Sequence, residues 1–272
     1  MKRYFLFILI ITISLSCEKK IEWQLQSQDN DVIYVDGIIT NENKIQTIKL
    51  SRFMSDPNEE PEPVFGAVVL VMVGDSVFEF KENVSSSGIY QTEKPLAGVT
   101  GIPYNLRIIY NGNDFTAHNF MNPELEFDPL HYQKINLTNK YRITWVALAV
   151  NPNKPAMYEI LLDWSHIPPY NNHAPELSKA RLLYYTLPSL DVSEIFAPQL
   201  EKLLFPEGTI IIEKRYSLSL AHADFIRGVL LETNWNGGLF GSASANVPTN
   251  LSEGAAGFFG ACGVSMDTII VQ

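Results

Sequence analysis

The chain has 272 residues, of which 20 are basic and 30 acidic, and its formal net charge is −10. An acidic balance of this kind disfavours nucleic-acid binding, because contacts from Lys and Arg to phosphates supply most of that affinity. Nearly half of the residues are apolar, which is enough for the core of one large domain or of two ordinary ones.

The first sixteen residues have the pattern of a secretory signal. Two basic residues precede an apolar core at residues 4–13, which is about half of the roughly twenty residues that a membrane-spanning helix needs. Small residues then lead to Cys17, as at the cleavage site of a bacterial lipoprotein. We predict a lipoprotein signal peptide at 1–16, a lipidated Cys17 and a polar tether at 17–30. The alternatives are a conventional signal with a chance cysteine and a permanent membrane anchor.

Lipid attachment at this cysteine would place the mature chain on a membrane. Two or three acyl chains hold a protein there stably, whereas one chain is marginal. Loss of residues 1–16 removes two basic residues and no acidic one, which leaves 18 basic and 30 acidic residues and a net charge near −12. The mature chain is therefore expected to be an acidic protein that is tethered by its N-terminus.

Residues 31–120 are predicted to form a small β-sandwich, because short apolar segments recur there at regular spacing between turns. The first strand is expected to break at Asp36-Gly37. Residues 64–73 are rich in Val, which favours a strand that is buried on both faces or lies in a sandwich core. The apolar residues assigned to the first strand are Val32, Tyr34 and Ile38.

Two hairpin turns support the sandwich. Gly74-Asp75 follows the Val-rich segment, and Asn111-Gly112 is a favoured two-residue hairpin turn. The strand before this second turn alternates cleanly between apolar and polar residues, with Tyr104, Leu106 and Ile108 on one face.

Residues 121–140 are predicted to be a linker, because prolines and acidic residues open this segment. A second, β-rich domain with one or two short helices is predicted at 141–272. Ser219 is a suitable N-cap for a helix that continues through Asn234. The other predicted elements are strands at 141–150, 157–164, 181–187, 209–218 and 269–271, and a short helix over 195–204 that ends near Pro206.

Several short motifs occur in an order that resembles a known family. They are Val35-Asp36-Gly37, Val64-Phe65-Gly66-Ala67, Gly88-Ile89-Tyr90, Gly101-Ile102-Pro103-Tyr104, Tyr216-Ser217-Leu218 and Gly254-Ala255-Ala256-Gly257. In this order they resemble the Bacteroidota lipoprotein family called domain of unknown function 4249. The resemblance covers most of the mature chain.

The resemblance implies a fold and a cellular setting. The fold would be an N-terminal Ig-like or transthyretin-like sandwich, similar to carboxypeptidase regulatory domains, followed by a β-rich domain. Family members tend to be encoded near TonB-dependent receptors, which implies an outer-membrane location and an accessory role in nutrient uptake. Surface-exported lipoproteins of this phylum carry an acidic cluster after the cysteine. Here Glu18-Lys19-Lys20 has a single acid, so periplasmic and surface-facing orientations are both compatible with it.

No metal or cofactor site is predicted. The five histidines lack the local spacings of a zinc site. The acidic residues at 56–62 lack the regular spacing of a calcium loop. Trp164, Tyr170 and Trp235 are weak candidates for a platform that binds a peptide or a glycan, although aromatic residues at this density are also typical of a core.

No catalytic constellation is visible either, so we expect a protein that is not an enzyme. Asp163-Trp164-Ser165-His166 has the residue types of a hydrolase triad, but neighbours on a strand point to opposite faces. Cys262 lies among small and apolar residues and is expected to be a buried small hydrophobe. One alternative is a hydrolase that assembles its site from distant residues such as Asp163, His166 and His222. Another is a structural adhesion protein.

Overall fold

The computed structural model describes residues 32–52, 60–148, 151, 153–172, 174–188, 203–234 and 247–272. In chain order, the elements are β1 (Ile33–Thr40), β2 (Thr47–Arg52), β3 (Val68–Val73), β4 (Ser76–Glu82), β5 (Ile89–Gln91), β6 (Pro103–Tyr110), β7 (Asn113–Phe120), β8 (His131–Lys134), β9 (Lys140–Trp145), β10 (Ala156–Asp163), η1 (Tyr170–Asn172), α2 (Pro175–Ser178), β11 (Lys179–Thr186), β12 (Phe205–Pro206), β13 (Ile210–Ser217), α4 (Leu220–Asn234) and β14 (Ala255–Ile270). The fold is mainly β, as the sequence predicts.

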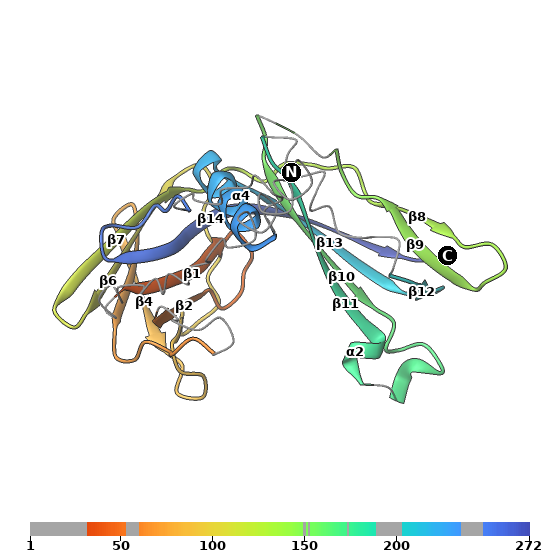
Figure 1. The fold of residues 1–272 in the computed structure, drawn as a ribbon, viewed down its shortest axis with the longest axis horizontal. Helices are drawn as coiled ribbons and strands as arrows, with labels where there is room; N and C mark the ends of the chain where they lie inside the picture. Colours follow the sequence, from red (N-terminus) through yellow and green to blue (C-terminus); the bar gives the residue numbers. More distant parts are fainter. Residues whose placement is uncertain are drawn as a thin grey trace, which may run out of the picture. The chain divides into compact units, whose positions relative to one another are not determined.

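Among the described residues, eleven strands form one continuous sheet (Figure 1). Their order is β11-β10-β13-β14-β1-β2-β5-β4-β3-β6-β7. A second sheet has three strands in the order β12-β9-β8. Most neighbours are antiparallel, but β1 and β14 are parallel.

The strands from β1 to β7 fold over into a sandwich-like arrangement around one apolar core. β1 and β2 supply Val35 and Ile48 to this core, and β3 and β6 supply Val69 and Leu106. All four side chains are buried. The strands on the two sides are joined through β4 and β5, which pair with each other. The predicted N-terminal sandwich is confirmed in this sense.

Both predicted hairpin turns are present. The Gly74-Asp75 turn joins β3 to β4, and the Asn111-Gly112 turn joins β6 to β7. Asn111 and Gly112 both have positive φ, at 48° and 78°, which is the requirement of a type I′ hairpin turn. The alternation predicted for the strand before this turn is confirmed, because Tyr104, Leu106 and Ile108 are all buried.

The prediction for the first strand was wrong in two respects. β1 runs without a break through Asp36-Gly37 and pairs with β2 and β14 on either side. Its buried apolar residues are Ile33, Val35 and Ile39, whereas Tyr34 is exposed. Gly37 is needed for close packing rather than for a turn, because a Cβ there would lie 2.8 Å from Cγ1 of Ile48.

β14 connects the two halves of the eleven-stranded sheet. Its first half, residues 255–262, pairs with β1, and its second half, residues 263–270, pairs with β13. The sequence predicts a strand only at residues 269–271, whereas β14 begins at Ala255. Its glycines allow close approach of neighbouring strands, because a Cβ on Gly257 would overlap the carbonyl of Val35.

The second half of the sheet consists of β11, β10, β13 and the end of β14. The predicted strands at 157–164, 181–187 and 209–218 are confirmed within two residues as β10, β11 and β13. The strand predicted at 141–150 corresponds to β9, which is shorter than predicted and ends at Trp145. A second apolar core lies on one face of this half and includes Tyr158 of β10 and Ile211 of β13.

The helix predicted after Ser219 is confirmed as α4. The Ser219 hydroxyl accepts a hydrogen bond from the backbone N–H of His222 at 3.2 Å, as an N-cap does. α4 packs beside β14, where Phe225 stacks on Phe258 with ring centroids 5.1 Å apart (Figure 1). The helix predicted over 195–204 lies almost wholly outside the described residues.

Candidate functional site

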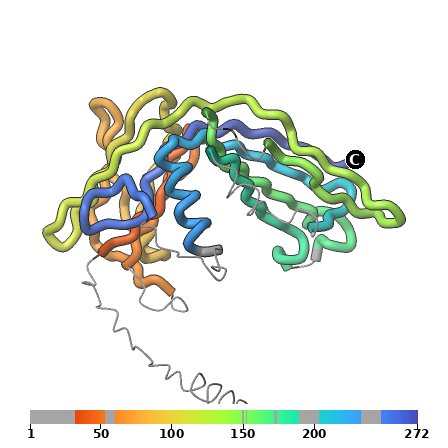
Figure 2. Tube along the Cα trace, turned by 45° about the horizontal axis from the view of Figure 1, so that its top comes forward, coloured from red at the N-terminus to blue at the C-terminus, as the bar shows by residue number. Residues whose placement is uncertain are grey.

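A candidate site begins with an extended segment that crosses the second half of the sheet. We call residues 122–130 the strap (Figure 2). The backbone N–H of Gly263 donates to the carbonyl of Asn122 at 3.0 Å. The Ser265 hydroxyl donates to the carbonyl of Leu125 at 2.5 Å. The first part of the predicted linker is therefore bonded to β14, and β8 follows directly after it.

The strap alternates between the sheet and solvent, as an extended chain does. Leu125 and Phe127 are half-buried, and Phe127 packs edge to face on Tyr158 with ring centroids 6.0 Å apart. The side chains that alternate with them are exposed and acidic, namely Glu124, Glu126 and Asp128. The apolar positions hold the strap on the sheet, and the acidic positions stay available to a ligand.

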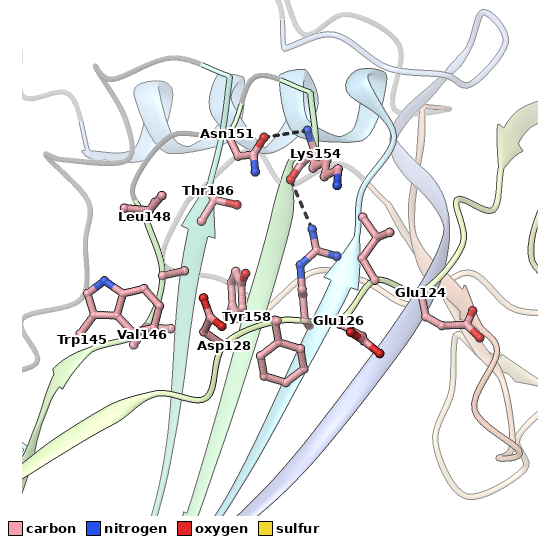
Figure 3. Close-up of a pocket in the computed structure, with 14 residues that line it drawn as sticks. Glu124, Glu126, Asp128, Trp145, Val146, Leu148, Asn151, Lys154, Tyr158 and Thr186 are labelled. Carbon is pink, nitrogen blue, oxygen red and sulfur yellow. Dashed lines mark hydrogen bonds between the residues drawn. The ribbon is translucent and has the colours of Figure 1, made fainter.

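The strap forms one wall of a cavity of about 580 Å³. Other walls come from the end of β9 and the residues that follow it, 145–148, from Asn151 and Lys154, and from β10, β11 and β13. The lining residues are Glu124, Leu125, Glu126, Phe127, Asp128, Trp145, Val146, Ala147, Leu148, Asn151, Lys154, Tyr158, Thr186 and Arg215. Figure 3 shows Glu126 and Asp128 on one side of this cavity and Asn151 and Lys154 on the opposite side.

Arg215 is the most unusual lining residue, because only 4% of it is exposed. Its Nη1 donates to the Ser217 hydroxyl at 2.7 Å, and its Nη2 donates to the Lys154 carbonyl at 3.3 Å (Figure 3). The guanidinium carbon lies 5.9 Å from the ring centre of Tyr158. No carboxylate of the described residues is within ion-pair distance of it. A buried cation held only by neutral groups is costly to desolvate.

The exposed carboxylates of the strap also lack a protein counter-charge. Among the residues that the structure describes, none of Glu124, Glu126 and Asp128 forms an ion pair. The exposed Lys154 adds one positive charge to the side of the cavity that lies opposite Asp128. The cavity therefore has a buried cation within it and three acids along one wall.

Aromatic and aliphatic groups also line the cavity. The rings of Trp145 and His131 are tilted against each other with centroids 4.8 Å apart, and Leu148 is 73% exposed. The Tyr184 hydroxyl donates to the carbonyl of Ala147 at 3.2 Å, which fixes this wall against β11. Burial raises the pKa of Tyr158, although the positive charge of Arg215 opposes that shift. Tyr158 is therefore a neutral aromatic surface at pH 7.

Glu213 lies on the same strand as Arg215 and is fully buried. Its Oε2 accepts a hydrogen bond from the backbone N–H of Leu130 at 2.9 Å, where the strap ends. Its Oε1 has no hydrogen-bond partner among the described residues. Desolvation raises the pKa of Glu213 to about 7. This carboxyl group therefore anchors the strap and titrates near neutral pH.

The aromatic residues singled out from the sequence do not gather around this cavity. Trp164 is buried in the second core, and its indole N–H donates to the Leu177 carbonyl at 3.1 Å. Tyr170 packs at the edge of the same core. Trp235 lies outside the described residues, as do Cys17, the signal peptide at 1–16 and the whole tether at 17–30.

The residues proposed for a hydrolase also lie apart. Asp163 accepts hydrogen bonds from the backbone and hydroxyl of Ser165, at 2.9 and 2.6 Å. These bonds and Lys179 lower the pKa of Asp163 to about 2. His166 instead contacts the carbonyl of Gly208 at 3.1 Å. Asp163 and His166 therefore each have other partners.

His222 faces Cys262, with 3.8 Å between its Nδ1 and the sulfur. Burial lowers the pKa of His222 to about 4 and raises that of Cys262 to about 12. Both groups are thus neutral at pH 7, whereas a nucleophilic cysteine requires a thiolate. The prediction that Cys262 is buried is confirmed.

Sequence reasoning missed the principal residue of the cavity. Arg215 lies on the same buried face of its strand as Ile211, two residues after Glu213. Two opposite charges at inward positions of a predicted core strand are a detectable signal, because such residues are rarely fully buried. The strap acids were noticed, but their composition indicated a linker.

Two further findings concern the residues that the structure describes. These residues contain no group of three or more His, Cys, Asp or Glu that could hold a metal ion. Within the same ranges, no helix is both long and apolar enough to cross a membrane.

Comparison with known families gives one match. The family model described as Domain of unknown function (DUF4249) matches residues 18–268. No curated protein matches the chain. The matched range includes the strap, the cavity and both halves of the sheet.

Proposed function

The chain belongs to the DUF4249 family, and on that premise we propose that it is a lipid-anchored binding protein of the cell envelope. In this proposal it is not an enzyme. It binds a nutrient and acts as an accessory partner of a TonB-dependent receptor in the outer membrane. The family description assigns no activity, so the support for the binding role comes from the residues of this chain.

The cavity around Arg215 is the observation that carries the binding role. A concave site with apolar walls and a few convergent polar groups is typical of ligand recognition. Catalysis by a nucleophile additionally needs a base within hydrogen-bond reach. The lining has no Ser, Cys or His, so its chemistry suits binding better than acyl transfer.

The N-terminal pattern supports attachment to a membrane. The apolar core at residues 4–13 ends shortly before Cys17, and the following polar residues give the folded part reach from the membrane surface. The receptor partnership rests on the resemblance to envelope lipoproteins that are encoded near such receptors.

Replacement of Cys17 tests the anchor. We expect Cys17→Ala to abolish labelling by an alkyne analogue of palmitate and to release the protein from the membrane fraction. Cys262→Ala is the matched control, because it removes the other cysteine of the chain and should leave both properties unchanged. Unchanged labelling of Cys17→Ala would refute the anchor.

Copurification tests the partnership. We expect the tagged full chain, solubilised from native membranes in mild detergent, to retain a TonB-dependent receptor that mass spectrometry identifies. The Cys17→Ala chain serves as the control for capture after lysis. Repeated isolation of the wild-type chain without such a receptor would contradict the accessory role.

A further inference from the structure

The geometry points to a short peptide as the ligand of the cavity, bound through its free C-terminal carboxylate to Arg215 and through a positive charge to the acids of the strap. This inference deepens the proposed binding function, on which it rests, by naming the substrate class. It depends on three features of the cavity lining, which are a buried cation, a row of acids and an apolar surface.

Arg215 provides the carboxylate position. Its guanidinium is planar and presents several donors in a fixed fork that matches a carboxylate. Ser217 and the Lys154 carbonyl hold this fork in place, so little side-chain freedom is lost when a ligand binds. Because no described carboxylate pairs with Arg215, a ligand carboxylate would supply the missing charge.

The strap acids determine the rest of the ligand. Glu124, Glu126 and Asp128 line the same cavity and repel a ligand with several negative charges, such as a phosphate ester or a dicarboxylate. They favour an amine or a basic side chain. A ligand that is negative at one end and positive at the other satisfies both Arg215 and the strap, and a peptide with a basic residue is such a ligand.

The apolar part of the cavity takes an apolar side chain. Phe127, Trp145, Leu148 and Tyr158 all line it, and Leu148 is largely exposed to solvent. A cavity of about 580 Å³ is within the usual range for small ligands, about 300–1,000 Å³, and accommodates a tripeptide. A neutral glycan would leave Arg215 without a counter-charge, so the cavity favours a peptide over a glycan.

The test uses the unaltered full chain, purified from membranes in detergent, and isothermal titration calorimetry. The probes are the tripeptide Lys-Ala-Phe, its C-terminal amide, and Ala-Ala-Phe, which lacks the basic side chain. We expect saturable binding of Lys-Ala-Phe and affinity about a hundredfold weaker for the amide, because truncating one partner of a buried charge pair has an effect of this order. Ala-Ala-Phe should bind about three- to fivefold more weakly, as exposed charges contribute little.

Variants of the chain locate the two ends of the ligand. Arg215→Gln should reduce affinity for Lys-Ala-Phe to that of the amide and abolish discrimination between the two probes. Arg142→Gln is the control, since Arg142 is exposed on β9 and lies outside the cavity. Glu126→Gln combined with Asp128→Asn should remove the preference for Lys-Ala-Phe over Ala-Ala-Phe, while Glu207→Gln should not.

Two results would overturn the inference. One is equal affinity of the acid and the amide for the unaltered chain, which needs no variant to fold. The other is the absence of saturable binding at millimolar concentration by Lys-Ala-Phe, by Arg-Ala-Leu and by the dipeptides that lack one residue of either. This second result includes the case in which neutral oligosaccharides bind and the peptides do not. Either result leaves receptor copurification unaffected, so failure of the ligand class is distinguishable from failure of the proposed function.

Discussion

The two halves of the eleven-stranded sheet bury different kinds of polar side chain. In residues 32–120 the buried polar side chains of the described part are all neutral, namely Thr40, Gln46, Ser51, Thr92 and Asn119. In the described residues after 120, four buried side chains are acidic or basic, namely Glu159, Glu213, Arg215 and His222. Burying a charged group costs far more free energy than burying a neutral one. The described residues after 120 therefore bear a desolvation cost that residues 32–120 do not.

Gln46 and Glu213 make this difference concrete, because both are fully buried. The two N–H bonds of the Gln46 amide face three carbonyl oxygens, those of Thr40, Glu42 and Leu96, at nitrogen–oxygen distances of 3.0, 3.0 and 2.7 Å, so two of these oxygens share one hydrogen. Its Oε1 accepts from the Thr40 N–H at 3.1 Å. Glu213 has one oxygen without a partner. The first half is thus a satisfied scaffold, whereas the second half contains the unpartnered oxygen of Glu213 and the buried cation Arg215.

The largest predicted effect concerns the strand that both halves share. Gly257→Ala should destabilise the protein by about 4 kcal/mol, because a residue with a side chain is strained at positive φ and an overlapping Cβ forces neighbours to move. At Gly257, φ is +91° and the Cβ would overlap the Val35 carbonyl between β14 and β1. Chemical denaturation measures the change in the free energy of unfolding.

Gly66→Ala is the matched control for this substitution. Gly66 also has positive φ, at +69°, but nothing lies within 4 Å of its added Cβ. Only the backbone strain remains, at about 1 kcal/mol. Equal effects of the two substitutions would show that close packing of β14 on β1 does not matter.

A smaller effect is predicted for the satisfied scaffold. Gln46→Leu should destabilise the protein by roughly 2–3 kcal/mol, because buried carbonyls that lose their donor retain the desolvation cost. The loss should be the same at pH 6.5 and pH 8, since neither residue titrates. Thermal unfolding at the two pH values checks this. If the destabilisation by Gln46→Leu depended on pH, Gln46 would not differ from Glu213 in the way proposed.

Much of the first half is predictable from the sequence, because its rules are local. The type I′ turn at Asn111-Gly112 and the alternation before it follow from backbone conformation and burial alone. The error at Asp36-Gly37 has a non-local cause, since Gly37 packs against Ile48 of the neighbouring strand. Most of β14 is not predictable for the same reason, because its glycines pack against β1 and the strap, which are distant in the sequence.

The candidate site is less predictable, because its residues come from distant segments. Arg215 meets the strap only through the pairing of β13 with β14 and the hydrogen bonds from β14 to residues 122–125. Composition alone made the strap resemble a linker. The aromatic candidate Trp164 was chosen by residue type, and the structure places it in the second core.

The smallest predicted effect sharpens the comparison through pH. Folding raises the pKa of Glu213 from its ordinary value of 4.5 to about 7, so the folded state binds the proton more tightly than the unfolded state. The stabilising contribution is fully present below pH 4.5 and is lost as the pH rises through 7. Between pH 6.5 and pH 8 the wild-type chain should lose about 1 kcal/mol of stability by this linkage.

Glu213→Gln should abolish this loss, because an amide does not titrate while its oxygen still accepts the bond from Leu130. The interval above pH 6.5 is chosen because His222 contributes in the opposite direction below it. Its pKa is lowered from 6.5 to about 4, so its contribution is complete above pH 6.5 and decreases as the pH falls. Glu207→Gln, at an exposed position, should lose as much stability between pH 6.5 and pH 8 as the wild type does. Chemical denaturation at the two pH values measures this loss. If Glu213→Gln loses as much stability between pH 6.5 and pH 8 as the wild type does, the buried carboxyl group is not the titrating group. The second half of the sheet would then not differ from the first in the pH dependence of its stability.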